Sequence, residues 1–448
     1  MTRRPSAPSI PLAPPRPEGT VVSRRRVAPS AGRRRPVRTR LVGVAVAVLA
    51  ALTACTAPGA TPRATVAASP STPPSASTPS PTPTPAPTAP SSQRSSASPQ
   101  PSPAQQQAPV PGSAAGGSSG RATPGNPAGT AVVPAEARPV DTTHPDHVIG
   151  TGTAASCTSA AVVAAVAAGG TTVFDCGPDP VTIVVASTAK VVNARPDVVL
   201  DGGGLVTLSG GGTHRILYLN TCDQAQGWTT SHCQDQDHPH LTVQNLTFAD
   251  GSSVGQTTDG GGGGAIFARG GRLTVLSSRF VRNRCDPTGP DVGGAAIRAL
   301  SQYHGLPVYV VGSTFGGAAG QGGSCANGGA ISSIGVSWVV LNSVMSHNEA
   351  IGTGANPARA GTPGGGSGGA VYADGNTFTV RVAGSVIEDN HAREGGGAIF
   401  FVSNDRTGTL RIESSTLRRN PNDGFQTVPG IFYLGAAHDP QVTGSTVS

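Results

Sequence analysis

The stretch that decides the fold is DGGGGGAIFARGGRLTVLSSRFVRN, residues 259–283. Five glycines precede an apolar pair, a run rich in leucine and valine follows, and an asparagine ends it. The opening phrase returns in altered form as GGAAIRAL (293–300), GGAISSIG (328–335), GGAVYADG (368–375) and GGAIFFVS (396–403). Self-similarity of this kind is the sequence signature of a repeat architecture.

The phrases recur at roughly 30 residues, a spacing typical of solenoids. A β-branched run follows each phrase, and an asparagine follows most of these runs. Short alternating strands divided by glycine or polar turns predict an all-β coil with several strands per turn. The repeated structural positions are Gly263, Gly264, Ile266, Asn283, Gly328, Gly329, Ile331, Asn348, Gly368, Gly369, Asn390, Gly396, Gly397, Ile399 and Asn420.

Each part of the phrase has a predicted task in the coil. The glycines permit sharp bends between short strands, because glycine adopts backbone conformations closed to other residues. Ile266 then enters the core, and Asn283 is expected to stack with Asn348, Asn390 and Asn420 as a ladder. A phosphate-binding loop is excluded, because no lysine or helix start follows the glycines.

The paired phrases resemble those of a known family. Gly-Gly-Ala-Ile at 263–266, 328–331 and 396–399, with Phe-Val-Arg-Asn at 280–283, is similar to the repeats of chlamydial polymorphic outer-membrane proteins and of bacterial right-handed parallel β-helices. Variants of the second phrase stand at 345–348, 387–390 and 417–420. The resemblance covers residues 190–448 and implies a right-handed single-stranded parallel β-helix of the pectate-lyase-like type. It implies no particular reaction, since the family shares a scaffold. No membrane barrel follows the repeats, so we expect no autotransporter.

Composition divides the chain into three parts. Every aromatic residue lies after residue 140, whereas 28 of the 41 prolines lie before it. Residues 55–140, rich in Pro, Ser, Thr and Ala, are predicted to be a disordered linker, because they cannot bury enough surface to offset their chain entropy. Residues 141–448 form the predicted folded domain. It carries 16 basic and 22 acidic residues, although the whole chain has a net charge of +7, so we expect no nucleic-acid partner.

The N-terminal part, residues 1–54, has the features of an export signal. A basic segment precedes an apolar stretch at 41–52, which suits a signal peptide and is too short to span a bilayer. Leu52-Thr53-Ala54-Cys55 resembles the bacterial lipobox, which implies a lipid on Cys55. An ordinary secretory signal and twin-arginine export remain alternatives. We therefore expect an exported lipoprotein at the outer face of the cytoplasmic membrane, with the linker projecting the domain into or beyond the cell wall.

The strands at both ends of a solenoid have an unpaired edge that must be covered. SCTSAAVVAAVAAGG (156–170) predicts a short helix between a Ser or Thr N-cap and Gly169. This helix, in a cap of about 150–176, would cover strand edges that otherwise invite aggregation. PQVTGSTVS (440–448) ends on a strand-like phrase, so either the last coil caps itself or a partner covers it.

Six cysteines remain after Cys55, and an even number in an exported domain predicts disulfides. The preferred pairs are Cys157–Cys176, Cys222–Cys233 and Cys285–Cys325. The segment 222–240 also offers His232, Asp235, Asp237, His238 and His240, but its cysteines lack the short spacing of zinc sites. A disulfide-closed loop is therefore preferred to a metal site. Trp228 in this loop either stacks on a sugar ring or is buried and pins the loop.

Two functions are consistent with the sequence. A lyase of this fold needs carboxylates for Ca²⁺ and a basic residue, and a hydrolase needs facing carboxylates. The catalytic candidates are Asp374, Asp389, His391 and Asp405, with Glu388, Arg393, Arg406 and Asp201 near them or upstream. Glu388, Asp389 and His391 are also explained as a solvated turn. The sequence therefore favours a non-catalytic surface protein without cofactor or metal, which binds a polysaccharide or a cell-wall partner or has a structural or adhesive role. The alternative is a polysaccharide lyase or glycoside hydrolase.

Overall fold

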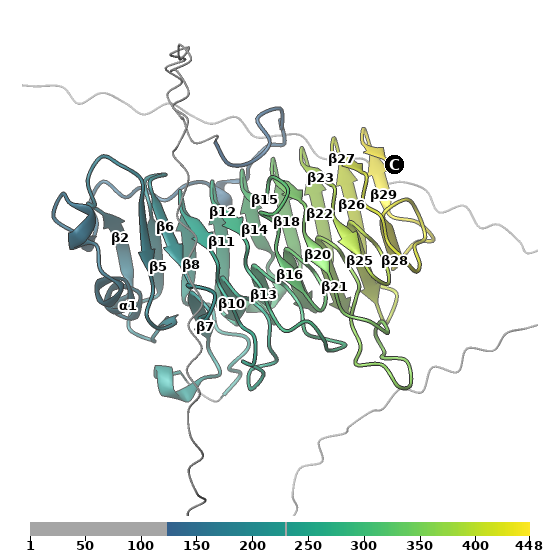
Figure 1. The fold of residues 1–448 in the computed structure, drawn as a ribbon, viewed down its shortest axis with the longest axis horizontal. Helices are drawn as coiled ribbons and strands as arrows, with labels where there is room; N and C mark the ends of the chain where they lie inside the picture. Colours follow the sequence, from purple (N-terminus) through teal and green to yellow (C-terminus); the bar gives the residue numbers. More distant parts are fainter. Residues whose placement is uncertain (1–122, 229–230) are drawn as a thin grey trace, which may run out of the picture. The chain divides into compact units, whose positions relative to one another are not determined.

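The computed structural model describes residues 123–228 and 231–448. Parallel strands from successive coils stack into three long sheets and one short sheet. The chain therefore forms the predicted parallel β-helix, whose coils follow one another along the long axis in Figure 1. The predicted signal peptide (1–54), Cys55 and the predicted linker as far as residue 122 lie outside the described residues.

The sheets are named A to D, and their strands are given in spatial order. Sheet A contains β1 (His147–Ile149), β2 (Gly170–Phe174), β5 (Asp197–Asp201), β8 (His240–Gln244), β11 (Arg272–Leu276), β14 (Val308–Val311), β18 (Trp338–Leu341), β22 (Thr379–Ala383), β26 (Thr409–Glu413) and β29 (Gln441–Thr443). Sheet B contains β3 (Val181–Val184), β6 (Val206–Ser209), β9 (Thr247–Ala249), β12 (Arg279–Val281), β15 (Thr314–Gly316), β19 (Val344–Ser346), β23 (Val386–Glu388), β27 (Thr416–Arg418) and β30 (Thr446–Val447). Sheet C contains β4 (Ala189–Lys190), β7 (Leu217–Asn220), β10 (Ile266–Arg269), β13 (Ile297–Ala299), β17 (Ile331–Ile334), β21 (Val371–Gly375), β25 (Ile399–Ser403) and β28 (Ile431–Leu434). Sheet D contains β16 (Ser324–Cys325), β20 (Glu349–Ala350) and β24 (His391–Ala392).

The stretch 259–283 supplies one coil. Its apolar pair begins β10, its leucine-valine run is β11, and the phrase before Asn283 is β12. The chain thus passes through sheets C, A and B in turn. Each side of the coil is only a few residues long, so the chain must bend sharply at short intervals. Glycines at the bends permit this.

In four of the five phrases two consecutive glycines serve different purposes, whereas in the phrase at 293–300 Ala295 takes the place of the second glycine. Gly263 has a left-handed φ of 66°, which favours glycine. Gly264 has an ordinary φ, but a Cβ there would lie 2.5 Å from the carbonyl oxygen of Arg284 in the next coil. The first glycine is therefore required by conformation and the second by space. The left-handed positions of the other phrases are Gly294, Gly328, Gly368 and Gly396, and the crowded ones are Gly329, Gly369 and Gly397.

The core fills the interior of the coil with matched side chains. Ile266 and the residues that correspond to it in the other phrases are buried and pair in register. On sheet B, Phe248, Phe280 and Phe315 stack with ring centroids 5.1 and 4.5 Å apart. Stacked aromatic rings add to the stabilisation from burial alone.

Buried asparagines form a row along one bend. The Asn348 side chain donates to Asn390 Oδ1 at 2.9 Å, and Asn390 donates to Asn420 Oδ1 at 2.9 Å. Asn283 is not part of this row, contrary to the prediction: its amide donates to the carbonyl of Phe248. The coil between it and Asn348 has Gly323 at this bend, and the Gly323 N–H donates to Asn348 Oδ1.

A row of serines follows the other bend, between sheets A and B. Each backbone N–H donates to the hydroxyl of the next serine at 3.0–3.1 Å. Each hydroxyl donates to the carbonyl two residues earlier, so both polar groups are satisfied. The row consists of Ser278, Ser313, Ser343, Ser385, Ser415 and Ser445.

Helix α1 (Ser159–Ala168) lies at the N-terminal end of the solenoid (Figure 1). The Thr158 side chain accepts from the N–H of Ala161, and Gly169 ends the helix, as predicted. In the described part of the chain no helix is long and apolar enough to cross a membrane. At the other end Val442 faces inward yet is 43% exposed. Four short 3₁₀ turns complete the described helices: Ala135–Ala137, Ala154–Ser156, Gln224–Gln226 and Tyr303–Gly305.

Residues 123–146, which we call the strap, differ from the sequence-based expectation. The linker was predicted to continue to residue 140, but the described chain from residue 123 onward packs on the solenoid. The strap begins beside the coils of β14, β18 and β22, runs back toward β2 and then enters β1. Figure 1 shows it as the blue segment along the upper edge of the solenoid.

Candidate functional site

The outer face of sheet A carries an uninterrupted column of side chains. Thr171, Val199, Thr242, Thr274 and Tyr309 pair in register on five consecutive strands. They alternate with inward-facing core residues, as the period of a strand requires. Because neighbouring strands lie about 4.8 Å apart, the column is about 19 Å long.

A cleft of about 640 Å³ lies over this column. The strap forms one wall through Glu136 and Val140. The turns that lead into sheet A form the other wall, through Leu306, Pro307 and the first residues of three strands. Those first residues are Asp197, His240 and Arg272. We call this cleft the strap groove.

The strap is held by paired hydrogen bonds to side chains of the solenoid. The side chain of Asn342 accepts from the Ala131 N–H at 2.8 Å and donates to the Ala131 carbonyl at 2.9 Å. The side chain of Gln244 makes the same exchange with Val140, at 3.0 Å each way. A primary amide that mimics a backbone partner in this way fixes the path of an otherwise irregular segment.

Asp201 anchors the strap near its entry into sheet A. Its carboxylate accepts from the Thr142 hydroxyl at 2.9 Å and from the Gln244 amide at 2.8 Å. Burial alone would raise the pKa of Asp201, but the hydrogen bonds from Gln244, Asn245, Gly203 and Thr142 outweigh burial and lower it. Asp201, a catalytic candidate from the sequence, thus holds the strap in place in the structure.

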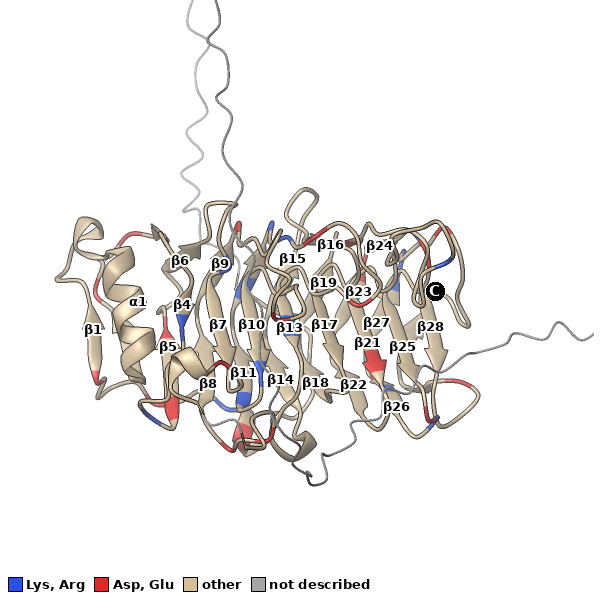
Figure 2. Ribbon diagram, turned by 90° about the horizontal axis from the view of Figure 1, so that it is seen from below, with Lys and Arg blue, Asp and Glu red and all other residues tan. Residues whose placement is uncertain are grey.

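Charged residues gather along the wall opposite the strap. His240 Nδ1 lies 3.3 Å from Asp197 Oδ1, and His240 Nε2 lies 3.7 Å from Asp237 Oδ1. Arg272 also contacts Asp237, and its hydrogen bond holds the pKa of the Asp237 carboxyl below the ordinary value. Figure 2 shows acidic and basic residues side by side near β8 and β11.

On the strap side, Glu136 contacts the end of the column. Its Oε1 accepts from the Tyr309 hydroxyl at 2.9 Å. Burial raises the pKa of Tyr309 to about 12, and the bond to Glu136 acts in the same direction. The phenol therefore stays protonated and presents a polar edge and an aromatic face to the groove.

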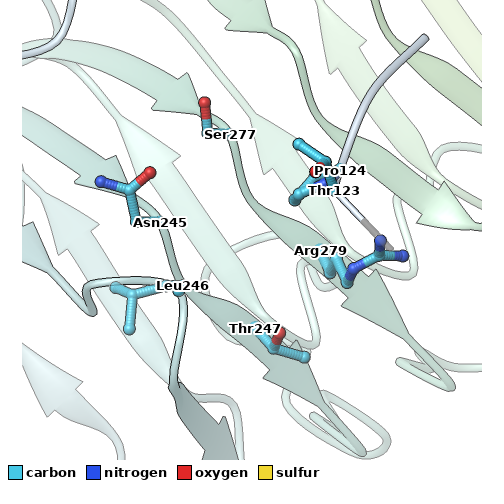
Figure 3. A pocket seen from close by; sticks show the side chains of 8 residues that line it. Thr123, Pro124, Asn245, Leu246, Thr247, Ser277 and Arg279 are labelled. Carbon is cyan, nitrogen blue, oxygen red and sulfur yellow. The ribbon is translucent and has the colours of Figure 1, made fainter. Parts of the chain in front are cut away.

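A second, smaller hollow of about 280 Å³ lies where the strap begins (Figure 3). Thr123 and Pro124 contribute from the strap, and Asn245, Ser277 and Arg279 contribute from two neighbouring coils. It is less than half the volume of the strap groove and has no aromatic residue in its lining. The strap groove is therefore the better candidate for an extended ligand.

The predicted catalytic residues are divided between two edges of the solenoid. Asp374 lies near the end of β21 and Asp405 in the turn after β25, and Asn404 donates to Asp374 at 3.1 Å. Asp389 lies at the opposite bend, after β23, and His391 begins β24 of sheet D. Asp389 pairs with Arg419, whose hydrogen bond lowers the pKa of Asp389, and His391 pairs with Asp423. Among residues 123–228 and 231–448, no three His, Cys, Asp or Glu side chains are grouped to hold a metal ion.

Asp374 belongs to a partly buried polar cluster beside the segment 351–367. The Asn356 amide donates to Tyr372 OH, to Asp374 Oδ2 at 3.2 Å and to Asp291 Oδ1 at 2.7 Å. Burial raises the pKa of Asp374 and lowers that of Arg298 to about 10. These side chains are packed against one another, so we infer that the cluster holds the segment 351–367 against the solenoid.

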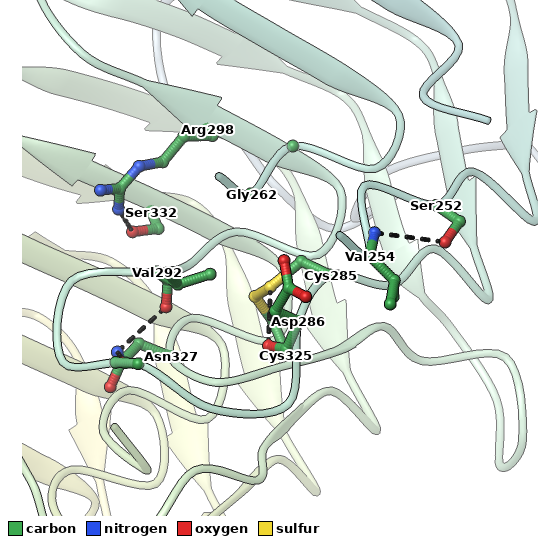
Figure 4. Close-up of a disulfide and its surroundings, with 12 residues drawn as sticks. Ser252, Val254, Gly262, Cys285, Asp286, Val292, Arg298, Cys325, Asn327 and Ser332 are labelled. Carbon is green, nitrogen blue, oxygen red and sulfur yellow. Dashed lines mark hydrogen bonds between the residues drawn. A yellow bond between two sulfur atoms is a disulfide. The ribbon is translucent and has the colours of Figure 1, made fainter. Parts of the chain in front are cut away.

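The preferred disulfides are the ones that the structure contains. Cys157 pairs with Cys176, Cys222 with Cys233, and Cys285 with Cys325. Figure 4 shows the last of these joining two loops of neighbouring coils.

The loop closed by Cys222–Cys233 has no grouped metal ligands among its described residues. Trp228 is 5% exposed and lies against His238, so it is buried in the loop rather than available to a sugar. Asp235 pairs with His304, and Asp237 with Arg272. His232 and Cys233 belong to the turns that close the loop.

Sequence reasoning missed most of the strap groove. Asp197, His240 and Arg272 are each the polar first residue of a strand, in DVVLD, HLTVQ and RLTVL, and this shared position was a usable signal. Glu136 carried no such signal, because it lies in a segment whose composition predicts disorder. Tyr309 stands in a predicted strand, but its place in the column depends on register.

We compared the chain with protein-family models, curated proteins and solved structures, and none of these comparisons gives a match.

Proposed function

We propose that this protein is an exported, lipid-anchored surface protein that binds a polysaccharide in the strap groove without cleaving it. The observation that carries the proposal is the groove itself: a long, open cleft whose floor combines threonine hydroxyls with Tyr309. Hydroxyl groups and an aromatic face suit the polar edges and apolar faces of sugar rings. The groove runs across five coils, so it fits a chain better than a single small molecule.

Binding can be tested with the full-length protein and one matched pair of variants. Thr274→Trp would fill the floor of the groove, whereas Gln441→Trp introduces the same side chain at the same column beyond it. We expect the unmodified protein and Gln441→Trp to bind a polysaccharide on a glycan array and by calorimetry. We expect Thr274→Trp to bind about tenfold or more weakly, a loss of about 1.4 kcal/mol.

Three outcomes would contradict parts of this proposal. If the unmodified protein binds no polysaccharide, the binding function is wrong. Equal binding by Thr274→Trp and Gln441→Trp would place the ligand elsewhere. New reducing ends or unsaturated products would replace the non-catalytic function with the lyase or hydrolase alternative.

The anchored location rests on Leu52-Thr53-Ala54-Cys55 and the basic and apolar segments before it. We expect Cys55→Ser to move the protein from the membrane fraction to the medium, because the lipid would have no attachment atom. Ser71→Ala, a small change in the predicted linker, serves as the control and should stay with the membrane. Retention of Cys55→Ser on the membrane would overturn the lipoprotein assignment.

A further inference from the structure

The strap groove carries more negative than positive charge. Three carboxylates, Glu136, Asp197 and Asp237, stand on it or at its rim, against one permanently charged cation, Arg272. Arg272 already forms a salt bridge with Asp237. Even with His240 protonated, the carboxylates outnumber the cations. Arg138, on the strap beside Glu136, is exposed and is not part of the groove lining.

Two of these carboxylates have no fixed cationic partner. In the part of the chain that the structure describes, neither Glu136 nor Asp197 lies within salt-bridge distance of an arginine or lysine; Asp197 pairs only with His240. The Asp197 side chain is 62% exposed. An ionised carboxylate accepts several hydrogen bonds, so both groups retain capacity for a ligand.

Glu136 and Asp197 face the groove from opposite walls and at different levels. Glu136 stands on the strap at the level of Tyr309 in β14, and Asp197 begins β5 on the other side. Three steps between strands separate β5 from β14 in sheet A, which is about 14 Å along the coil axis. A single sugar cannot reach both carboxylates, whereas a chain lying along the column can.

We infer that the strap groove takes a polysaccharide that bears ammonium groups, that is, a chain of amino sugars with free amines, in preference to a uronic-acid chain. Ammonium groups make charge-assisted hydrogen bonds to carboxylates. Uronate carboxylates would meet like charges on both walls, which disfavours them as ligands. This inference rests on the proposed function and specifies the substrate class of the same site.

The test compares three hexamers with the full-length protein by calorimetry: glucosamine, its fully N-acetylated form and galacturonate. We expect the glucosamine hexamer to bind best, the acetylated form more weakly and galacturonate least. Added salt should weaken the glucosamine hexamer most, because screening acts on exposed charges. Shorter glucosamine oligomers, which cannot span both carboxylates, should lose this advantage.

Charge-neutralising variants locate the effect. Glu136→Gln and Asp197→Asn should each weaken glucosamine binding about three- to fivefold, as expected for losing one exposed charge pair, and leave the acetylated hexamer unchanged. Asp439→Asn, which removes an exposed carboxylate in the turn after β28, is the control and should have no effect.

The inference and the proposed function fail in different ways. Galacturonate binding as tightly as glucosamine, or glucosamine binding that neither groove variant weakens, would overturn the inference while binding in the groove stands. Binding of the acetylated hexamer alone would also overturn it. If none of the hexamers and no polysaccharide binds, the proposed function falls and the inference with it.

Discussion

Replacing Gly369 with alanine is expected to destabilise the protein by about 3 kcal/mol or more. The φ of Gly369 is ordinary, so backbone conformation is not the reason. A Cβ at this position would lie 2.1 Å from the carbonyl oxygen of Gly397 and 2.7 Å from that of His391. Both are backbone atoms of the next coil, and the hydrogen bonds between coils hold them in place. The coils would have to separate locally to admit the methyl group.

The measurement is the free energy of unfolding from urea titration, followed by circular dichroism. Gly335→Ala is the matched control, because Gly335 has a φ of 66° but nothing within 4 Å of an added Cβ. It should cost only about 1 kcal/mol, from left-handed backbone strain alone. If Gly369→Ala cost no more than Gly335→Ala, the coils would be able to spread, and space would not explain the second glycine of the four phrases that have one.

Replacing Asn390 with alanine is expected to cost about 3 to 5 kcal/mol, through several buried groups that lose their partners at once. Asn390 is fully buried. Its Oδ1 accepts from the N–H and the side chain of Asn348, at 3.0 and 2.9 Å. Its amide donates to the carbonyl of Met345 at 2.9 Å and to Asn420 Oδ1 at 2.9 Å. Water cannot enter freely to replace these bonds in the middle of the row.

Thermal and urea unfolding of Asn390→Ala can be compared with those of Asn422→Ala. Asn422 makes an exposed side-chain bond to Gln426 close to the same edge, so its loss should change stability by less than about 0.5 kcal/mol. Similar losses for the two variants would mean that the buried row contributes nothing beyond an ordinary surface amide.

The repeat could be predicted because each of its signals acts locally. The first glycine of a phrase is required by its own φ, and Ile266 faces inward because of its place in a short strand. Such constraints are visible in one sequence without knowledge of register. The row of asparagines was predicted for the same reason. The prediction was wrong for Asn283. Asn283 could join the row only if the next coil had an asparagine at the same bend, and that coil has Gly323 there.

The strap could not be predicted from composition, because it is not held by a core of its own. Its attachment comes from the side chains of Asn342 and Gln244, which bond to its backbone. Leu276 and Leu341 gave an indirect signal: they are buried but lie outside the central core, on the outer face of sheet A. This signal can be recognised only after the strands have been assigned to sheets. Prediction of the strap groove requires the same assignment.

The path of the strap also decides how the molecule responds to mechanical load. The described chain enters the fold at residue 123, beside the middle coils, and not at the cap helix. Tension applied at residue 123 would therefore act first on the bond from Gly125 to Thr314 and on the bonds to Asn342. It would act next on the bonds to Gln244 and then on the bond to Asp201. We expect these contacts to break one after another before force reaches β1 and α1. We therefore expect the strap to act as a sacrificial tether, which would lengthen under load while the coils behind it keep their shape.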